Sequence, residues 1–323
     1  MNRSLVALLV CIPLVACGGG GGEKKTSTAP AEQAAANFPA GTGQDLRQLV
    51  GNLAEGPVLA PTGRVFEPGK RNRLAFALFD TGREQVSDAQ VAVYLLSKGL
   101  RQARGPYVAR LQTLDVKPQY RSRQTASDLD FNDAIYVASV PIPRRGDYVI
   151  AGIVSIGGTR YRTSQIAISA GKASGALPPA VGDRAPRVHT PTAADVGGSL
   201  ERIDTRVPPV ASLHEVDAAD VIGRQPLVLV FSTPQLCQSR VCGPVTDIAY
   251  QVQSASEGDA VRFVHMEIYN DNEVAKGLRP QVRRYRLPTE PWTFVIDRTG
   301  VVRERFEGAF SVAELAAAVR RVG

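Results

Sequence analysis

The feature that most constrains the fold is a continuous apolar run, Leu227–Phe231, which leads into a loop with two cysteines. Such a run predicts a strand that is covered on both faces, as in an α/β sheet. Cys237 and Cys242 lie in the loop, and Pro244 then opens a helical pattern. Its apolar residues recur at i, i+3, i+4 and i+7, which predicts an amphipathic helix with proline in its first turn: Val245, Ile248, Ala249 and Val252. Both cysteines therefore lie between a buried strand and the start of a helix.

The remainder of the C-terminal half continues this alternation of strands and helices. Ala260–Val264 and Trp292–Ile296 are short apolar stretches that predict two further strands. Asp297–Gly300 is a turn signal that leads into one more strand, and Val312–Val319 predicts a final helix. The expected order is strand, cysteine loop, helix, strand, strand, hairpin and helix.

This order resembles the thioredoxin superfamily, in its extracytoplasmic redoxin branch. Two further segments carry the resemblance: Gly182-Asp183-Arg184-Ala185-Pro186, and Glu290-Pro291-Trp292-Thr293-Phe294-Val295-Ile296-Asp297 with Gly300 after it. The resemblance implies an α/β thioredoxin-like fold for residues 181–323. It also implies thiol–disulfide exchange at Cys237 and Cys242, with Pro291 as a cis-proline against the pair. The implied partners are protein thiols or disulfides, and no cofactor is expected.

The cysteine loop departs from the family pattern in its spacing. Four residues separate Cys237 from Cys242, where thioredoxins have two. Cys242-Gly243-Pro244-Val245 resembles the family's Cys-Gly-Pro-Cys with valine in the last position. This alignment makes Cys242 the nucleophile and Cys237 the resolving thiol, and the reverse assignment stays open. We favour Cys242 slightly, because the positive end of the helix dipole lowers the pKa of a thiol beside it.

Other functions of the two cysteines also stay open. In an oxidising compartment a cysteine pair often forms a static disulfide, which would make the chain a non-catalytic binding protein. The pair also resembles the copper site of Sco-type chaperones, because soft thiolates suit Cu(I). That alternative needs a histidine, and the candidate ligand set is then Cys237, Cys242 and His265.

The first residues of the chain read as a secretion signal. A short positive start is followed by an apolar stretch, and Leu14-Val15-Ala16-Cys17 resembles the bacterial lipobox. The resemblance implies a signal peptide over residues 1–17 and acylation of Cys17. We therefore expect a lipoprotein of the bacterial cell envelope, anchored to the bilayer and facing the extracytoplasmic side. Disulfides persist in that compartment.

Between the signal and the cysteine half we expect a tether, a β domain and a linker. Five consecutive glycines and a run of small and polar residues predict a disordered tether over residues 18–51. Short apolar stretches with turn punctuation predict an all-β immunoglobulin-like sandwich over residues 52–170. Residues 171–180 predict a linker. The β domain is basic, but it lacks the interleaved aromatic residues of single-strand binders, so we expect no nucleic-acid partner.

Overall fold

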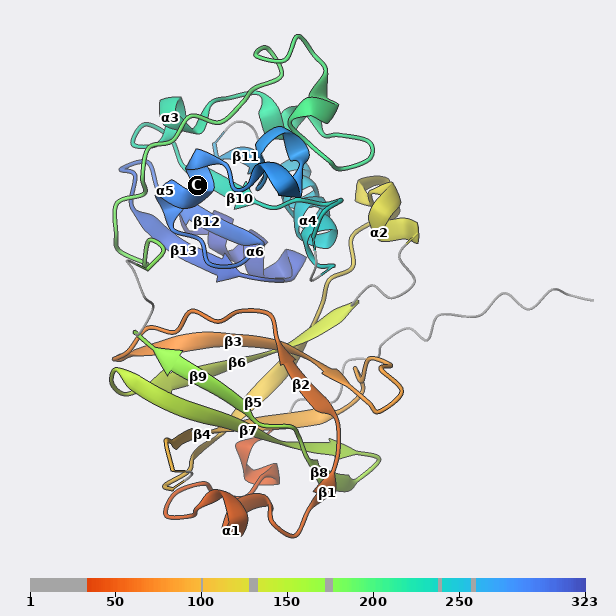
Figure 1. Ribbon diagram of the computed structural model, residues 1–323, viewed down its shortest axis with the longest axis vertical. Helices are drawn as coiled ribbons and strands as arrows, with labels where there is room; N and C mark the ends of the chain where they lie inside the picture. Colours follow the sequence, from red (N-terminus) through yellow and green to blue (C-terminus); the bar gives the residue numbers. More distant parts are fainter. Residues whose placement is uncertain (1–33, 100, 128–132, 172–176, 238–239, 257–259) are drawn as a thin grey trace, which may run out of the picture.

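The computed structural model describes residues 34–99, 101–127, 133–171, 177–237, 240–256 and 260–323. Figure 1 shows a β-rich N-terminal part below an α/β C-terminal part. The expected signal peptide and Cys17 lie outside the described residues, so lipidation stays a prediction. Among the residues that are described, no helix is both long and apolar enough to cross a bilayer.

The β part is built from nine strands that belong to one hydrogen-bonded sheet. The path runs β1-β8-β7-β4-β5-β6-β3-β2, and β9 also pairs with β7. Because β4, β5 and β6 link the two halves of this path, the sheet curls on itself, and the predicted immunoglobulin-like sandwich is not confirmed. The strands are β1 (Ala54–Glu55), β2 (Val58–Pro61), β3 (Lys70–Phe79), β4 (Gln90–Ser97), β5 (Arg104–Thr113), β6 (Ala134–Ile142), β7 (Gly146–Ile156), β8 (Thr159–Arg162) and β9 (Ile166–Ala170).

Part of the expected disordered tether, residues 34–51, covers one face of strand β4. Strand β4 is therefore buried on both faces, and the expectation of a tether up to residue 51 is corrected for these residues. One face of β4 points into the core of the curled sheet, whereas Ala92, Tyr94 and Leu96 belong to a second apolar cluster. That cluster is closed by Phe38 and by helix α1 (Leu46–Val50). Asp45 and Gln48 form a capping box at the start of α1, so even this short helix is well defined. Residues 34–51 therefore pack against the sheet, where the polar composition had suggested a solvated segment.

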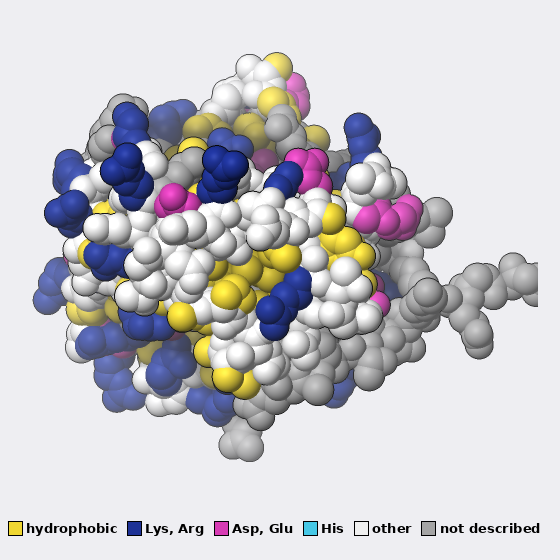
Figure 2. Space-filling view, turned by 90° about the horizontal axis from the view of Figure 1, so that it is seen from below, with side chains coloured by type: hydrophobic (Ala, Val, Ile, Leu, Met, Phe, Trp, Pro, Cys, Tyr) yellow, Lys and Arg dark blue, Asp and Glu magenta, His cyan; other side chains and the backbone are white. Residues whose placement is uncertain are grey.

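Viewed from the end of the β part, most of the charged side chains on the surface are basic. Figure 2 shows Lys and Arg side chains spread over this face, with apolar side chains between them and few acidic ones. The net charge of the whole chain is +7. A basic face of this kind suits solubility or contact with an anionic surface, and it reveals no chemistry of its own.

The α/β part contains one four-stranded mixed sheet, and its strands lie where the apolar stretches predicted them. Its four strands lie in the order β11-β10-β12-β13. The first pair is parallel, and the other two pairs are antiparallel. The strands are β10 (Leu227–Phe231), β11 (Arg262–Met266), β12 (Trp292–Ile296) and β13 (Val302–Glu307), and the helices are α3 (Ala218–Val221), α4 (Cys242–Ala255), α5 (Pro280–Tyr285) and α6 (Val312–Arg320).

Strand β10 is fully buried, as its apolar run predicts. Val228 and Val230 face the cluster that contains α4 and α6, whereas Leu227, Leu229 and Phe231 face the opposite cluster, which contains α5. Short 3-10 turns complete the described secondary structure: Ala35–Asn37, Pro118–Tyr120, Leu200–Arg202, Ala211–His214, Asn270–Asn272 and Val274–Lys276.

The two parts share a hydrophobic core, so a split into independent domains is not confirmed. Leu114, Val116 and Ile135 of the β part belong to the same buried cluster as Phe306 and Phe310 of the α/β part. Ion pairs reinforce this contact, with Arg73 Nε 2.8 Å from Glu314 Oε1 and Arg305 Nη2 2.5 Å from Glu67 Oε1. Residues before and after the predicted linker 171–180 thus pack against each other.

Candidate functional site

The two cysteines are joined by a disulfide, with their Cα atoms 5.9 Å apart. Cys237 comes from the loop after β10, and Cys242 is the first residue of α4, which begins two residues before the predicted Pro244. The exposure of the two residues differs. Cys242 is fully buried, whereas Cys237 is only half-buried. Cys237 is therefore the more exposed residue of the pair.

The start of α4 is suited to a thiolate at Cys242. The residue before the helix, Val241, supplies no side-chain cap, and no acidic residue lies in the first turn. The helix dipole therefore favours negative charge at this point. The hydroxyl of Thr246 donates to the carbonyl of Cys242 at 2.9 Å and lies 2.7 Å from the hydroxyl of Ser232. These contacts hold the helix start against the end of β10.

The Glu290–Pro291 peptide bond is cis, as the resemblance implies. Pro291 is buried and directly precedes β12. In the sheet, Trp292 pairs with Phe231, the last residue of β10. Pro291 is thus placed at the same edge of the sheet as the start of the cysteine loop. Its contact with the disulfide itself stays a prediction.

A segment of the β part lies over α4, and sequence reasoning missed it. This segment, residues 114–127, is called the strap below; it contains α2 (Arg123–Ser127), which Figure 1 shows beside α4. The backbone N–H and the hydroxyl of Ser122 donate to Asp247 of α4 at 2.9 and 3.1 Å. A side chain at Gly243 would meet Thr125 at 3.0 Å, so the strap also packs closely on the first turn.

A buried ion pair fastens the strap. Arg206 Nε lies 2.8 Å from Asp247 Oδ1, and their side chains are 3% and 0% exposed. The guanidinium also donates to the carbonyl of Tyr120 in the strap at 2.8 Å. Burial raises the pKa of Asp247, although Arg206 and Ser122 oppose this effect. The ion pair thus joins α4 to the segment around Arg206, and hydrogen bonds join both of them to the strap.

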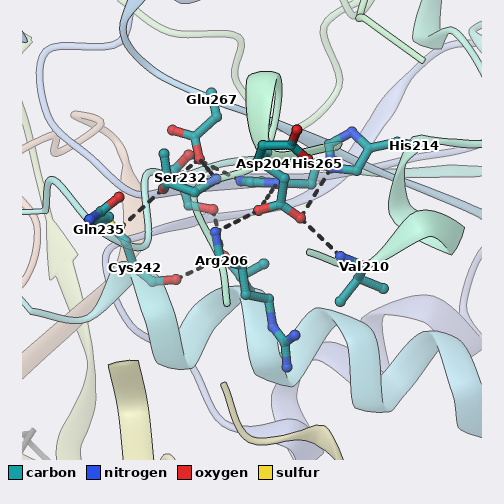
Figure 3. A network of polar contacts seen from close by, with 12 residues as sticks. Asp204, Arg206, Val210, His214, Ser232, Gln235, Cys242, His265 and Glu267 are labelled. Carbon is teal, nitrogen blue, oxygen red and sulfur yellow. Dashed lines mark hydrogen bonds and ion pairs between the residues drawn. The ribbon is translucent and has the colours of Figure 1, made fainter. Parts of the chain in front are cut away.

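A second polar cluster lies beside the end of β10, and Figure 3 shows it. Asp204, His214 and His265 are all buried, and their potential ligand atoms lie within 4.8 Å of one another. His265 belongs to β11, while His214 ends a 3-10 turn. Burial disfavours the ionised form of Asp204, but His265 and His214 outweigh that effect and hold its pKa below the ordinary value.

The position of His265 argues against the copper set of Cys237, Cys242 and His265. Its Nε2 lies 3.1 Å from the carbonyl oxygen of Ser232, and its Nδ1 lies 3.4 Å from Asp204 Oδ1. Both ring nitrogens therefore face oxygen atoms. Within the described residues, the group of side chains close enough to hold a metal ion contains His265 but neither cysteine.

Two carboxyl groups near this region have raised pKa values. Burial, followed by repulsion from Glu267, raises the pKa of Glu290 to about 7. Burial likewise raises the pKa of Glu267 to about 7, although hydrogen bonds from Thr205 oppose it. The sequence shows Glu290 only as the residue before Pro291. A shifted pKa depends on what the fold places around the group, and no local pattern reveals it.

Comparisons with known proteins give little further information. No family model matches the chain, and no curated protein matches it significantly. Among solved structures, a thiol:disulfide interchange protein of the thioredoxin family from Chlorobium tepidum TLS is 17% identical, with 46% of this chain and 99% of that chain covered and a TM-score of 0.30. A thioredoxin-like superfamily protein is also 17% identical, with 33% and 85% covered and a TM-score of 0.27. Domains 4 and 5 of the S-layer protein SbsC are 14% identical, with 35% and 45% covered and a TM-score of 0.17.

Proposed function

We propose that the chain exchanges thiols and disulfides through the Cys237–Cys242 pair. One observation carries the proposal: a disulfide at the uncapped start of α4, with one half-buried and one buried cysteine. The strand order of the α/β part and the cis peptide bond before Pro291 support it. The proposed substrates are protein thiols or disulfides.

The difference in exposure between the two cysteines supports the following roles for their sulfur atoms. A substrate thiolate attacks Sγ of Cys237, the S–S bond breaks, and Cys242 leaves with the electron pair. The helix start stabilises this departing thiolate. A second substrate thiolate then attacks the substrate sulfur of the mixed disulfide and releases Cys237 as a thiolate. The substrate is oxidised by two electrons and the chain is reduced by two.

The reverse sequence reduces a substrate disulfide. Cys237 then makes the first attack, and Cys242 resolves the mixed disulfide from within. This assignment differs from the sequence-based preference for Cys242 as the nucleophile, because the sequence shows how near each cysteine is to the helix but not how deeply it is buried. Acylation of Cys17 would hold the site at the extracytoplasmic face of a membrane.

The test uses the full chain with Cys11 and Cys17 replaced by alanine, which leaves two thiols. In this background Cys242→Ser leaves the half-buried Cys237, and Cys237→Ser is the matched control that leaves the buried Cys242. With glutathione disulfide as probe, we expect Cys242→Ser to form a mixed disulfide at least about tenfold faster. Equal rates would overturn the assignment of roles.

A redox titration of the unsubstituted pair separates exchange from a static disulfide. An exchanging pair should equilibrate with glutathione or dithiothreitol at a potential above about −300 mV. A pair that stays oxidised below that potential, with no mixed disulfide in either serine variant, would identify a structural disulfide and refute the proposed function.

A further inference from the structure

Three side chains from separate segments meet inside the α/β part. Asp204 follows the 3-10 turn Leu200–Arg202, His214 ends the turn Ala211–His214, and His265 lies in β11. Each of the three is only about 1% exposed. Figure 3 shows His214 on the side of the Asp204 carboxylate away from Cys242, whereas the ring of His265 reaches the carbonyl of Ser232. The thiol–disulfide chemistry proposed above uses none of them.

The contacts in this cluster are ion pairs that lack the geometry of hydrogen bonds. His214 Nε2 lies 3.3 Å from Asp204 Oδ2, and His265 Nδ1 lies 3.4 Å from Asp204 Oδ1. Neither nitrogen has a hydrogen-bond partner, although both are buried. Two tetrahedral ligands that each lie about 2.05 Å from one zinc ion are separated by about 3.4 Å. The two separations run to different oxygens of Asp204, and each is close to this ligand-to-ligand distance. With one ligand atom from each residue, the three atoms lie within 4.8 Å of one another.

The tautomer of His265 points to a cation at the same place. Its Nε2 faces the carbonyl oxygen of Ser232 at 3.1 Å, and a carbonyl only accepts, so Nε2 carries a hydrogen. In the neutral ring Nδ1 then has a lone pair, which faces a carboxylate oxygen of Asp204. Two acceptors at this distance repel each other unless a positive charge lies between them. A metal ion bound between Nδ1 and the carboxylate supplies such a charge.

The surroundings hold the three side chains in place. Each oxygen of Asp204 accepts one backbone N–H, from Arg206 at 2.9 Å and from Val210 at 3.1 Å. The bond from His265 to a backbone carbonyl is the outer contact that metal-binding histidines usually make. Glu267 adds a second buried carboxyl group, which interacts electrostatically with Asp204. A concentration of buried acceptors with fixed outer contacts suits a metal ion.

We propose that Asp204, His214 and His265 bind one divalent transition-metal ion, for which Zn²⁺ is the best fit. Two imidazole nitrogens and one carboxylate oxygen form a donor set that zinc accepts, and the site needs no sulfur. The ion joins β11 to the segment around Arg206. That segment also holds the cysteine loop, since Thr205 accepts a hydrogen bond from the backbone N–H of Gln235 at 3.1 Å. The site therefore supports the region around the disulfide without taking part in exchange.

The test measures Zn²⁺ binding by the full chain with its Cys237–Cys242 disulfide intact. After treatment with a chelator, dialysis against Zn²⁺ alone should load one ion per chain. His265→Ala and Asp204→Asn should each weaken binding by about 100-fold or more, beyond the loss typical of an outer contact. Asp204→Asn keeps the size of the side chain and an acceptor for one of the two backbone N–H groups. His189→Ala is the matched control, because His189 is an exposed histidine outside the cluster.

A second measurement uses the unsubstituted chain, so its result does not depend on whether the variants fold. Co²⁺ added to the oxidised, unsubstituted chain should give the visible bands of a tetrahedral site with nitrogen and oxygen ligands, without a sulfur-to-metal charge-transfer band. Absence of Zn²⁺ binding by the oxidised chain would overturn the proposal. Equal loss in the His189 variant, or binding that requires reduction of the disulfide, would overturn it too. None of these outcomes depends on whether the disulfide exchanges with substrates.

Discussion

Replacement of Asp247 with asparagine tests the buried ion pair that fastens the strap. The substitution keeps the shape of the side chain and one acceptor oxygen, but it leaves Arg206 without an opposite charge. Because the two side chains are 0% and 3% exposed, water cannot solvate the remaining guanidinium. Removal of one partner from a buried pair costs about 3–5 kcal/mol. We expect a value near the lower end, about 3 kcal/mol, because Arg206 keeps its bond to the carbonyl of Tyr120.

The assay is equilibrium unfolding in denaturant, with the Cys237–Cys242 disulfide intact throughout. A loss of about 3 kcal/mol raises the unfolding equilibrium constant by roughly 100-fold. The variant Arg206→Met and the double variant complete a thermodynamic cycle. We expect the double variant to lose at least about 1 kcal/mol less than the sum of the single losses, because it buries no unpaired charge.

An exposed pair in the same chain is the matched control. Arg162 Nη2 lies 2.8 Å from Glu55 Oε1, the same distance as in the buried pair, but the side chains are 33% and 85% exposed. Glu55→Gln should therefore cost no more than about 1 kcal/mol. Equal losses for Asp247→Asn and Glu55→Gln, or additive losses in the cycle, would refute the argument that burial makes the Arg206–Asp247 pair important.

Three further predictions concern other parts of the fold. Asp217→Asn should lower the pKa of His189, because the hydrogen bond that the imidazole donates to the Asp217 carboxylate raises that pKa. The pair stabilises the fold below the ordinary histidine pKa, and this stabilisation is lost as pH rises through the raised value. An unchanged titration midpoint of His189 by NMR would contradict the prediction. As pH rises from about 5 to about 8, Glu290→Gln should become more stable to heat relative to the parent, because burial raises the pKa of Glu290 to about 7 and its ionisation then opposes folding. A difference in Tm that does not change with pH would contradict this prediction. Gly308→Ala should cost about 2 kcal/mol or more in chemical unfolding, because Gly308 has φ +75° and a Cβ there would collide with the backbone oxygen of Thr62; a smaller loss would mean that the contact relaxes.

The order of elements around the cysteines could be predicted because local patterns determine it. A short continuous apolar run such as Leu227–Phe231 indicates a strand that is covered on both faces. The helical repeat from Val245 to Val252 likewise leaves one face to bury. These two patterns place Cys237 and Cys242 at the junction of a strand and a helix, and the structure joins them by a disulfide there.

The features that the sequence did not reveal depend on contacts between distant residues. The strap has no marked periodicity, and its importance comes from donors that meet Asp247 across more than a hundred residues. The Asp204–His214–His265 cluster is dispersed in the same way, so no spacing motif signals it. The closing helix α1 is only five residues long, and its neighbours in sequence are polar or small. Composition therefore favoured a disordered segment.

The close fit of Thr125 against Gly243 has a consequence for modular engineering. An α/β part cut from this chain at residues 171–180 would leave behind the strap that packs on the first turn of α4. The exposed turn would then be more accessible, but also less firmly held. A design that transfers this part to another protein should therefore include residues 114–127 as a second, non-contiguous segment.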